Sequence, residues 1–246
     1  MKKLCSLIAV ASGVMVAPNL YAAFDGTITI GGGGPQQFQN GGAFNATTTP
    51  LSGSPTLGAF QTFCIELHED ISFAAATYDY RINTGAVGGG GGANATDPFT
   101  GGSMDNVSMG TAWLYSQFRA GTLVDYNGTA ASAGALQNAI WYLENELPAS
   151  GPNSLLNYNG VSGATFIADA IDGTGKTILT GLLDDSHGAY GVVALNLYTK
   201  DGAHANAQDQ LAMVPVPEAS TIFAGALLLL PFAAGTIRGL RKTRIA

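Results

Sequence analysis

The sequence predicts an α+β domain, a β-sandwich or barrel with a helical insert, preceded by a signal peptide and followed by a C-terminal transmembrane sorting helix. Strand-like apolar runs lie toward both ends of the central region, and two segments between them carry apolar residues at helical spacing. Gly- and Thr-rich stretches separate these runs. The order of strands, helices and strands therefore indicates one large domain at residues 24–200.

Residues 1–23 have the features of a secretory signal peptide. Lys2 and Lys3 form a positive start, residues 4–17 are apolar, and Ala22 and Ala23 are both small enough for cleavage. We expect signal peptidase to cut after Ala22 or Ala23, so that the mature chain is exported.

The first part of the domain reads as strands separated by loops. Residues 27–30 predict one strand, and residues 31–55, rich in Gly, Thr and Ser, predict a loop. The alternating segment 62–67 predicts a half-buried strand, and a second strand is expected around 71–80. Five consecutive glycines at 88–92 predict another loop, without the Lys-Ser/Thr of a phosphate-binding loop.

Two helices follow in the middle of the chain. The first is expected over 108–120, with Ser108 as its N-cap and Gly121 as its stop. The second is expected over 132–147, because apolar residues recur there at helical spacing. We expect both helices to pack on each other and on the sheet, with two tryptophans largely buried: Trp113 and Trp141.

The rest of the domain is less regular. Residues 164–171 are compatible with a short helix and 177–183 with a strand, whereas 191–198 is the clearest late strand. The polar residues 201–214 read as a linker into the C-terminal segment, 215–246.

The mature region is strongly acidic. Four basic residues face sixteen acidic ones, for a net charge of about −12. Such a surface repels nucleic acid and anionic membranes, so nucleic acid is not expected as a partner and the surface of the mature domain is not expected to bind the membrane. The basic residues are Arg81, Arg119, Lys176 and Lys200.

The C-terminal segment combines a short polar signature, an apolar run at 222–237 and a basic end. About 16 residues at 1.5 Å each reach roughly 24 Å, which is short of the hydrocarbon core, and Pro231 interrupts the run. We therefore expect a transmembrane helix that serves as a temporary anchor. The signature is Val216, Pro217, Glu218, Ala219 and Ser220, and the basic anchor is Arg238, Arg241, Lys242 and Arg244.

This segment resembles the PEP-CTERM sorting signal of Gram-negative bacteria, in which a Pro-Glu-Pro motif precedes a membrane helix and an Arg-rich end. Here Ala219 stands in place of the second proline. The resemblance covers 215–246 and implies that exosortase removes the segment. It further implies export through the inner membrane and a final place at the cell surface or in the extracellular matrix.

Two motifs lie 73 residues apart: Phe63-Cys64-Ile65-Glu66 and Leu136-Gln137-Asn138-Ala139-Ile140. Together they resemble the thioester domains of bacterial surface adhesins, in which a cysteine sulfur attacks a glutamine side chain and releases ammonia. The resemblance implies that Cys64 and Gln137 form an internal thioester that later acylates a nucleophile on a surface ligand.

The same residues have a plain structural interpretation. Removal of the signal peptide leaves Cys64 as the one cysteine, and a lone cysteine outside the cell is either protected or simply a small buried apolar group. Gln137 is then a solvated helix residue. If the thioester forms, a nearby donor should favour the thiolate, and the candidates are Tyr115, His68 and Tyr142.

Other sites are weaker. One histidine among carboxylates, His68 with Glu66, Glu69 and Asp70, is a poor transition-metal set, and Asp184, Asp185 and His187 lack EF-hand spacing. No motif selects a carboxylate pair for polysaccharide hydrolysis.

We therefore expect no enzyme, no catalytic residues, no metal and no cofactor. The expected function is that of an envelope or exopolysaccharide-associated protein, either an adhesin with a Cys–Gln thioester or a non-covalent structural or carbohydrate-binding matrix protein. Expected partners are signal peptidase, exosortase, an extracellular polysaccharide or surface ligand, and transiently the membrane.

Overall fold

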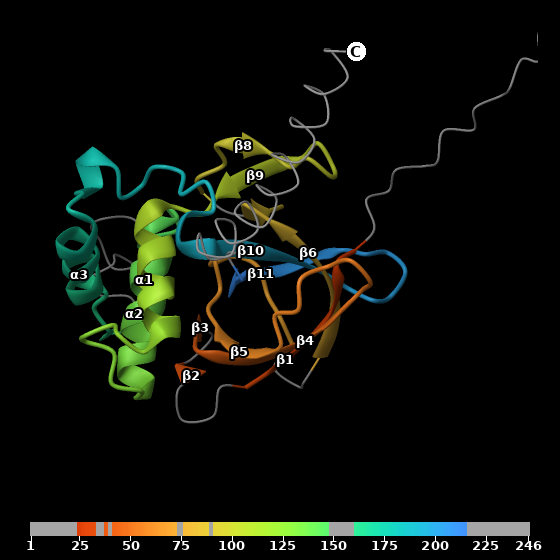
Figure 1. Cartoon of the computed structure of the whole chain (residues 1–246), viewed down its shortest axis with the longest axis horizontal. Helices are drawn as coiled ribbons and strands as arrows, with labels where there is room; N and C mark the ends of the chain where they lie inside the picture. Colours follow the sequence, from red (N-terminus) through yellow and green to blue (C-terminus); the bar gives the residue numbers. More distant parts are fainter. Residues whose placement is uncertain are drawn as a thin grey trace, which may run out of the picture.

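The computed structural model describes residues 24–32, 37–38, 41–72, 76–88, 91–147 and 160–215. These residues form a mixed α/β fold, a curled half-barrel sheet with helices gathered along one side (Figure 1). The predicted combination of strands and helices is confirmed. The signal peptide and the sorting helix lie outside the described residues, and none of the helices within them is long and apolar enough to cross a membrane.

The main sheet has six strands in the order β11-β10-β6-β1-β4-β5, with every neighbouring pair antiparallel. Because β6 and β10 are neighbours in space, the chain between them, including the three α-helices of the described residues, is inserted into this sheet. The strands are β1 (Gly26–Gly31), β4 (Phe44–Pro50), β5 (Ala59–Thr62), β6 (Ala76–Asn83), β10 (Val192–Tyr198) and β11 (Asn206–Met213).

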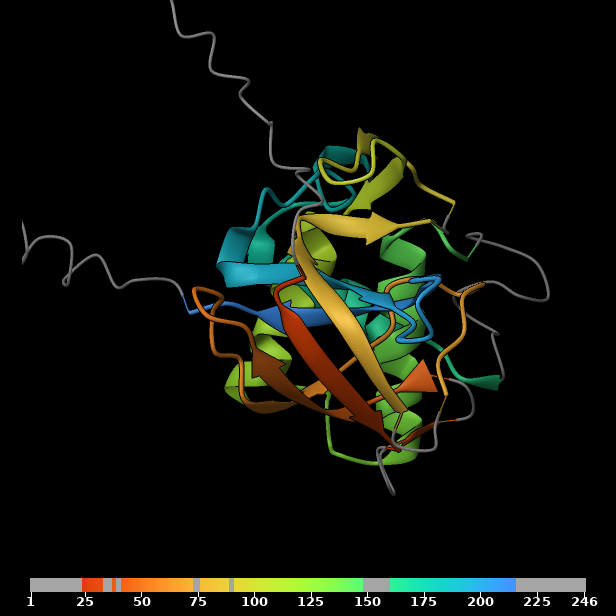
Figure 2. The same ribbon diagram turned by 90° about the vertical axis from the view of Figure 1, so that its right-hand side faces the viewer.

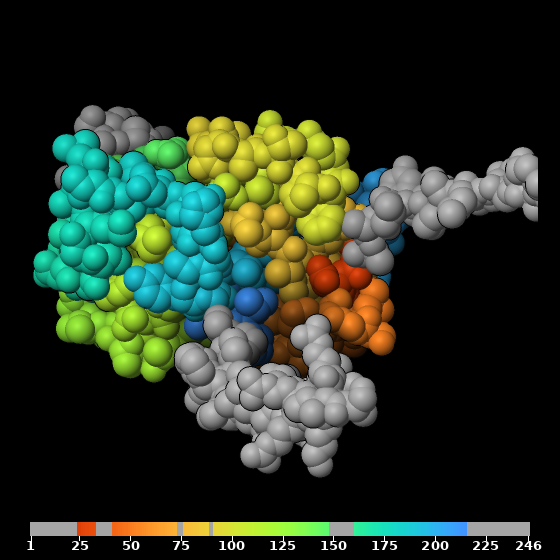
Figure 3. Space-filling view, turned by 45° about the horizontal axis from the view of Figure 1, so that its top comes forward, coloured from red at the N-terminus to blue at the C-terminus, as the bar shows by residue number. Residues whose placement is uncertain are grey.

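Two small sheets flank the main one. In Figure 2 the main sheet crosses in front of the helices, and in Figure 3 the three-stranded sheet, in yellow, covers surface next to the helical segments. The two-stranded sheet is β2 (Gln37–Phe38) with β3 (Gly41–Gly42), which packs on the helix α2 (Ala130–Leu143). The three-stranded sheet is β7 (Gly85–Val87), β9 (Ser103–Asn106) and β8 (Ala95–Thr96).

Helix α1 (Met109–Ala120) matches its prediction closely. The Ser108 hydroxyl accepts a hydrogen bond from the Thr111 N–H at 3.2 Å, which satisfies one of the open donors of the first turn. Gly121 ends the helix in the left-handed conformation, φ 70°. Local side-chain chemistry therefore predicts both ends correctly.

Helix α2 (Ala130–Leu143) starts two residues earlier than predicted, because the N-cap is Thr129. Ser132 is its capping-box partner rather than the cap itself. Leu147 is buried as expected but lies beyond the helix. The short helix suggested at 164–171 is confirmed and longer, as α3 (Ala164–Thr174).

Several strand predictions were wrong. Residues 44–50, predicted as loop, form β4, whose buried and exposed residues alternate. Residues 177–183, suggested as a strand, contain a 3-10 turn at Ile178–Thr180, closed by reciprocal Thr177 and Thr180 hydrogen bonds. The strand expected from 71 begins at Ala76 instead.

The linker predicted at 201–214 is also wrong, because residues 206–213 form β11, which is buried along most of its length. Three polar residues of this strand, Gln208, Asp209 and Gln210, are 3%, 0% and 0% exposed. Their polarity suggests solvation, but they hydrogen-bond inside the fold. The folded domain therefore continues past residue 200.

The two larger hydrophobic clusters among the described residues stabilise the fold. One lies between the helices and the sheet and includes Phe63, Ile65, Leu136 and Leu211. The other fills the curl of the sheet and includes Cys64. The predicted packing of helices on each other and on the sheet is confirmed.

The two tryptophans differ in burial. Trp141 is 4% exposed, as predicted. Trp113 is only partly buried, which corrects its prediction, and its ring lies against Gly173 of α3, where a Cβ would come within 1.9 Å.

Candidate functional site

The candidate site is centred on Cys64, which follows β5 in extended backbone. Its neighbours in sequence are paired with β11: the Ile65 N–H donates to Asp209 O at 3.0 Å, and the Leu211 N–H donates to Phe63 O at 3.0 Å. Since N–H and C=O groups alternate in direction along extended chain, the polar main-chain groups of Cys64 face the other way, toward α2.

Gln137 of α2 meets those groups. Its Oε1 accepts the Cys64 N–H at 3.1 Å, and its Nε2 donates to the Cys64 carbonyl oxygen at 2.7 Å. A main-chain N–H can only donate and a carbonyl can only accept, so these two bonds fix which end of the amide is oxygen. The amide thus occupies the place that a neighbouring strand would take.

The structure therefore brings Cys64 and Gln137 together across 73 residues of sequence, and both are buried, at 0% and 1% exposure. Gln137 is not the solvated helix residue of the plain interpretation. The electrophilic carbon of its amide lies beside the residue that carries the thiol, in a place closed to water.

A second main-chain donor reaches the same oxygen. The Gly42 N–H of β3 donates to Gln137 Oε1 at 3.3 Å. Gly42 has φ +97°, a conformation that residues with a side chain rarely adopt. The preceding residue, Gly41, lies so close to α2 that a Cβ there would be 2.7 Å from Gln137 Cγ and 2.8 Å from the Trp141 ring.

The thiol itself contacts Gln210 of β11, which forms an isolated antiparallel bridge with Cys64. The Gln210 Nε2 donates to Cys64 Sγ at 3.4 Å. Burial raises the pKa of the Cys64 thiol to about 12, and the Gln210 hydrogen bond only partly opposes this. The resting side chain is therefore a neutral thiol.

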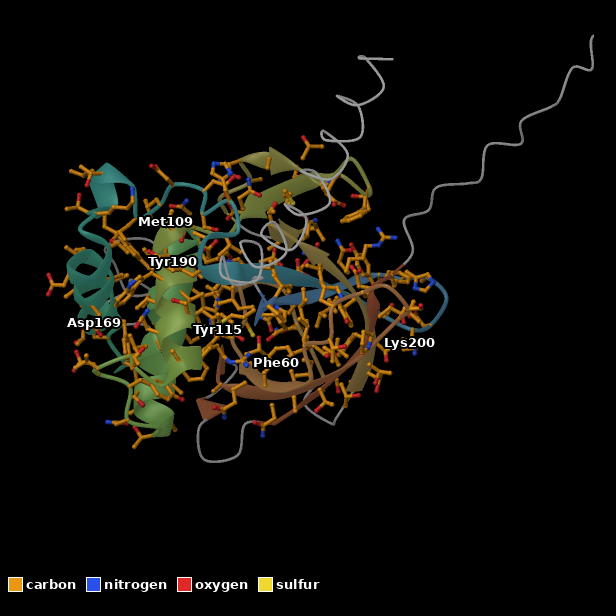
Figure 4. All side chains as sticks on the ribbon, viewed as in Figure 1. Phe60, Met109, Tyr115, Asp169, Tyr190 and Lys200 are labelled. Carbon is orange, nitrogen blue, oxygen red and sulfur yellow. The ribbon has the colours of Figure 1, made fainter. Side chains whose placement is uncertain are left out.

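The donor to the Cys64 thiol is Gln210 and is not among the three candidates taken from the sequence, Tyr115, His68 and Tyr142. The Tyr115 hydroxyl donates to Gln61 O at 2.8 Å instead, and Figure 4 shows Tyr115 of α1 near Phe60 of β5, where helix meets sheet. Among the described contacts of the thiol, neither His68 nor Tyr142 is a donor, and Gln210 takes that role. Its other amide atom, Oε1, is buried with no hydrogen-bond partner among the described residues.

A group of buried carboxylates lies two residues further along the same segment. Burial, a hydrogen bond with Glu69 and the charge of Asp209 raise the pKa of Glu66 to about 11. Glu146 accepts the Leu67 N–H at 3.1 Å and the Gly91 N–H at 2.6 Å, which ties the glycine loop to this group. Within the described chain no three His, Cys, Asp or Glu side chains are arranged to hold a metal ion.

The remaining candidates lie apart from this site. His187 Nδ1 lies 3.1 Å from Asp185 Oδ2, with the imidazole exposed and the carboxylate half-buried. The sorting signature at 216–220 and the basic anchor at 238–244 lie outside the described residues.

Comparison with known proteins adds no assignment: no protein-family model, curated protein or solved structure matches this chain.

Sequence reasoning missed Gly41, Gly42 and Gln210. Two adjacent glycines inside a Gly-rich stretch look like loop, although a positive φ and a close helix contact give each a specific role. Gln210 sat in the presumed linker. It lies inside 206–213, where three polar residues precede three apolar ones, so alternation gave no signal for a strand there.

Proposed function

We propose that this chain is a secreted, exosortase-sorted protein of the cell envelope or exopolysaccharide layer, an adhesin whose Cys64 and Gln137 form an internal thioester. One observation carries the proposal: the Gln137 amide is held by hydrogen bonds against the main chain of Cys64, in a site buried from water. On this proposal the domain is a barrel with a helical insert, flanked by a cleaved signal peptide and a cleaved sorting helix.

The chemistry balances without a further reactant. The Cys64 sulfur bonds to the Gln137 side-chain carbon, the carbon–nitrogen bond breaks, and the thiol proton leaves with the nitrogen as ammonia. An amide is a poor electrophile, so fixed placement must supply much of the rate, on the order of 7–11 kcal/mol at best. Two rigid elements, the β5 extension and α2, hold the partners in place.

Burial suits a stored acyl group. Water that cannot reach the bond cannot hydrolyse it, and a sulfur in a thioester is protected from the oxidation that threatens a free extracellular thiol. An amine or hydroxyl on a surface ligand would then take the acyl group and release the Cys64 thiol.

The intact mass of protein recovered from the envelope tests the proposal. The chain should be lighter than its sequence by one ammonia, and Cys64 should resist alkylation until methylamine opens the bond. The Gln137→Ala variant should have the full mass calculated from its own sequence. Its Cys64 thiol should be open to alkylation once the protein is unfolded. Gln117→Ala, on α1, is the matched control and should keep the mass deficit.

A second candidate is a non-covalent structural or carbohydrate-binding matrix protein in which Cys64 does not react: its thiol accepts a hydrogen bond from Gln210, and its raised pKa keeps it neutral. In that case Gln137 serves only to satisfy the main chain of Cys64. The wild-type protein would then have its full sequence mass and would be alkylated at Cys64 on unfolding, with or without methylamine.

The sorting part of the proposal rests on the sequence signature alone. We expect roughly residues 219–246 to be removed in the native host, so that peptides from 222–246 are missing from protein released at the surface. Reversing the charge of the basic anchor should impair retention before cleavage. Recovery of those peptides from surface protein would contradict a temporary anchor.

A further inference from the structure

Two main-chain N–H groups converge on one oxygen at the Cys64–Gln137 pair. The N–H of Cys64 and the N–H of Gly42 donate to Gln137 Oε1 at 3.1 Å and 3.3 Å. They come from different elements, the β5 extension and β3, and the oxygen they hold is buried. Paired N–H donors aimed at one oxygen in a dry site are the usual construction of an oxyanion hole.

Resting on the function proposed above, we propose that the N–H groups of Gly42 and Cys64 form the oxyanion hole of the thioester, with Gly41 as the residue that positions it. The proposal assigns a catalytic role to Gly42 and concerns both formation and opening of the thioester.

Negative charge develops on Gln137 Oε1 both when the thioester forms and when it is opened. When the sulfur bonds to the side-chain carbon, the carbonyl electron pair moves onto Oε1, and it returns when ammonia leaves with the thiol proton. When an amine later attacks the thioester, the pair moves onto the same oxygen, the carbon–sulfur bond breaks, and a proton of the amine ends on the sulfur. Two donors stabilise this charge without reorganisation of water.

The glycines explain how β3 reaches the site. At φ +97° Gly42 adopts a backbone conformation that favours glycine, and this conformation aims its N–H at Gln137. A side chain on Gly41 would displace Gln137 or Trp141, because a Cβ at this position would come within 2.8 Å of both. The Gly42 donor distance of 3.3 Å is long for an oxyanion hole, and such contacts shorten as charge develops.

A purely structural role for the two N–H groups makes a different prediction. In that case, weakening the Gly42 contact lowers the stability of the fold but leaves the reactivity of the thioester unchanged in the protein that remains folded. The test must therefore measure the reaction and not only the fold.

The experiment compares the full chain with Gly42→Ala and Gly41→Ala, using methylamine as the nucleophile. The rate of thiol release from Cys64 is measured well below the melting temperature of each variant. We expect release to slow about tenfold or more, since loss of one oxyanion donor costs roughly 100- to 1,000-fold in a protease. Gly53→Ala is the matched control, because Gly53 has φ +94° with open space around it, and it should react at the wild-type rate.

Infrared difference spectroscopy of the wild-type protein provides a second measurement that does not depend on the variants folding. The thioester carbonyl stretch, taken before and after methylamine, should lie at the lower frequency of a carbonyl that accepts hydrogen bonds. In a folded Gly42→Ala variant it should move to higher frequency.

The outcomes separate the two proposals. If the wild-type chain carries the mass deficit but its carbonyl stretch is that of a free thioester, or folded Gly42→Ala reacts at the wild-type rate, the oxyanion hole is overturned and the thioester stands. If the wild-type chain has its full sequence mass, the thioester is refuted, and the proposed oxyanion hole is refuted with it.

Discussion

Cys64 and Glu66 are two residues apart on one buried segment, yet the fold surrounds them differently. Both are almost fully buried, at 0% and 1% exposure. Cys64 faces neutral amides, Gln137 and Gln210, whereas Glu66 faces the carboxylates Glu69 and Asp209. Burial raises the pKa of each group, to about 12 and about 11, so each holds its proton at neutral pH.

The difference teaches that burial alone does not determine chemistry. A neutral thiol beside a neutral amide has a reaction available that consumes both groups and leaves nothing charged. A carboxyl among carboxylates has only ionisation available, and the buried surroundings oppose it. Five substitutions test the two halves of this comparison, starting with the largest expected effect.

Asp209 belongs to the acidic half of the comparison and accepts several buried hydrogen bonds. It accepts the Val87 N–H at 2.7 Å, the Leu197 N–H at 2.9 Å and the Asn196 amide at 2.7 Å. Asp209→Ala leaves these donors buried without an acceptor, so we expect a loss of about 3–5 kcal/mol of unfolding free energy. Urea melts measure it, and Asp201→Ala, at an exposed position, should leave the unfolding free energy nearly unchanged. Equal losses in the two variants would contradict the role of Asp209.

Gln137→Ala tests the neutral half. Before any thioester forms, the Gln137 side chain makes three hydrogen bonds, two to Cys64 and one to Gly42, so relative to the unreacted chain its removal should cost about 2–4 kcal/mol. The thioester should be lost entirely in the same variant, as judged by intact mass. A stability loss near zero would show that the main chain of Cys64 finds other hydrogen-bond partners in the variant. The hydrogen bonds of Gln137 would then not be what stabilises this part of the fold.

The raised pKa of Glu66 predicts that the unfolding free energy depends on pH. Its pKa is raised from 4.5 unfolded to about 11 folded, so the folded state binds the proton more tightly. The contribution of Glu66 to stability is full below about pH 4.5 and declines as pH rises toward its folded pKa. Burial raises the pKa of Glu144 to about 7, so its contribution also declines as pH rises. We expect unfolding free energy to fall between about pH 5 and pH 8, and Glu66→Gln to flatten that slope. Melts of both proteins across this range measure it, and a slope unchanged by the substitution would rule Glu66 out as its source.

Tyr115→Phe is the smallest expected effect. The hydroxyl donates to Gln61 O rather than to the thiol, so its loss should cost about 1 kcal/mol and leave the reactivity of Cys64 unchanged. Gln210→Ala is the informative partner variant, because it removes the donor at Sγ. If Tyr115→Phe slowed the release of the Cys64 thiol by methylamine while Gln210→Ala did not, the sequence-based candidate Tyr115 would be the correct donor.

The sequence alone determined what depends on local chemistry. The cap at Ser108, the stop at Gly121 and the apolar strand at 192–198 were all readable, because a helix end or a buried strand is specified by residues a few positions apart. The motifs around Cys64 and Gln137 also named a pair that the fold does bring together.

Only the tertiary structure decided the rest, because the deciding partners are distant in sequence. Residues 206–213 look solvated until Glu66, Cys64 and Leu197 are seen to hydrogen-bond with their polar groups. The glycines of β3 look like loop until α2 lies against them. A polar side chain or a glycine has no fixed environment of its own; the folded chain supplies its partners, and only those partners decide whether it is solvated, structural or part of a site.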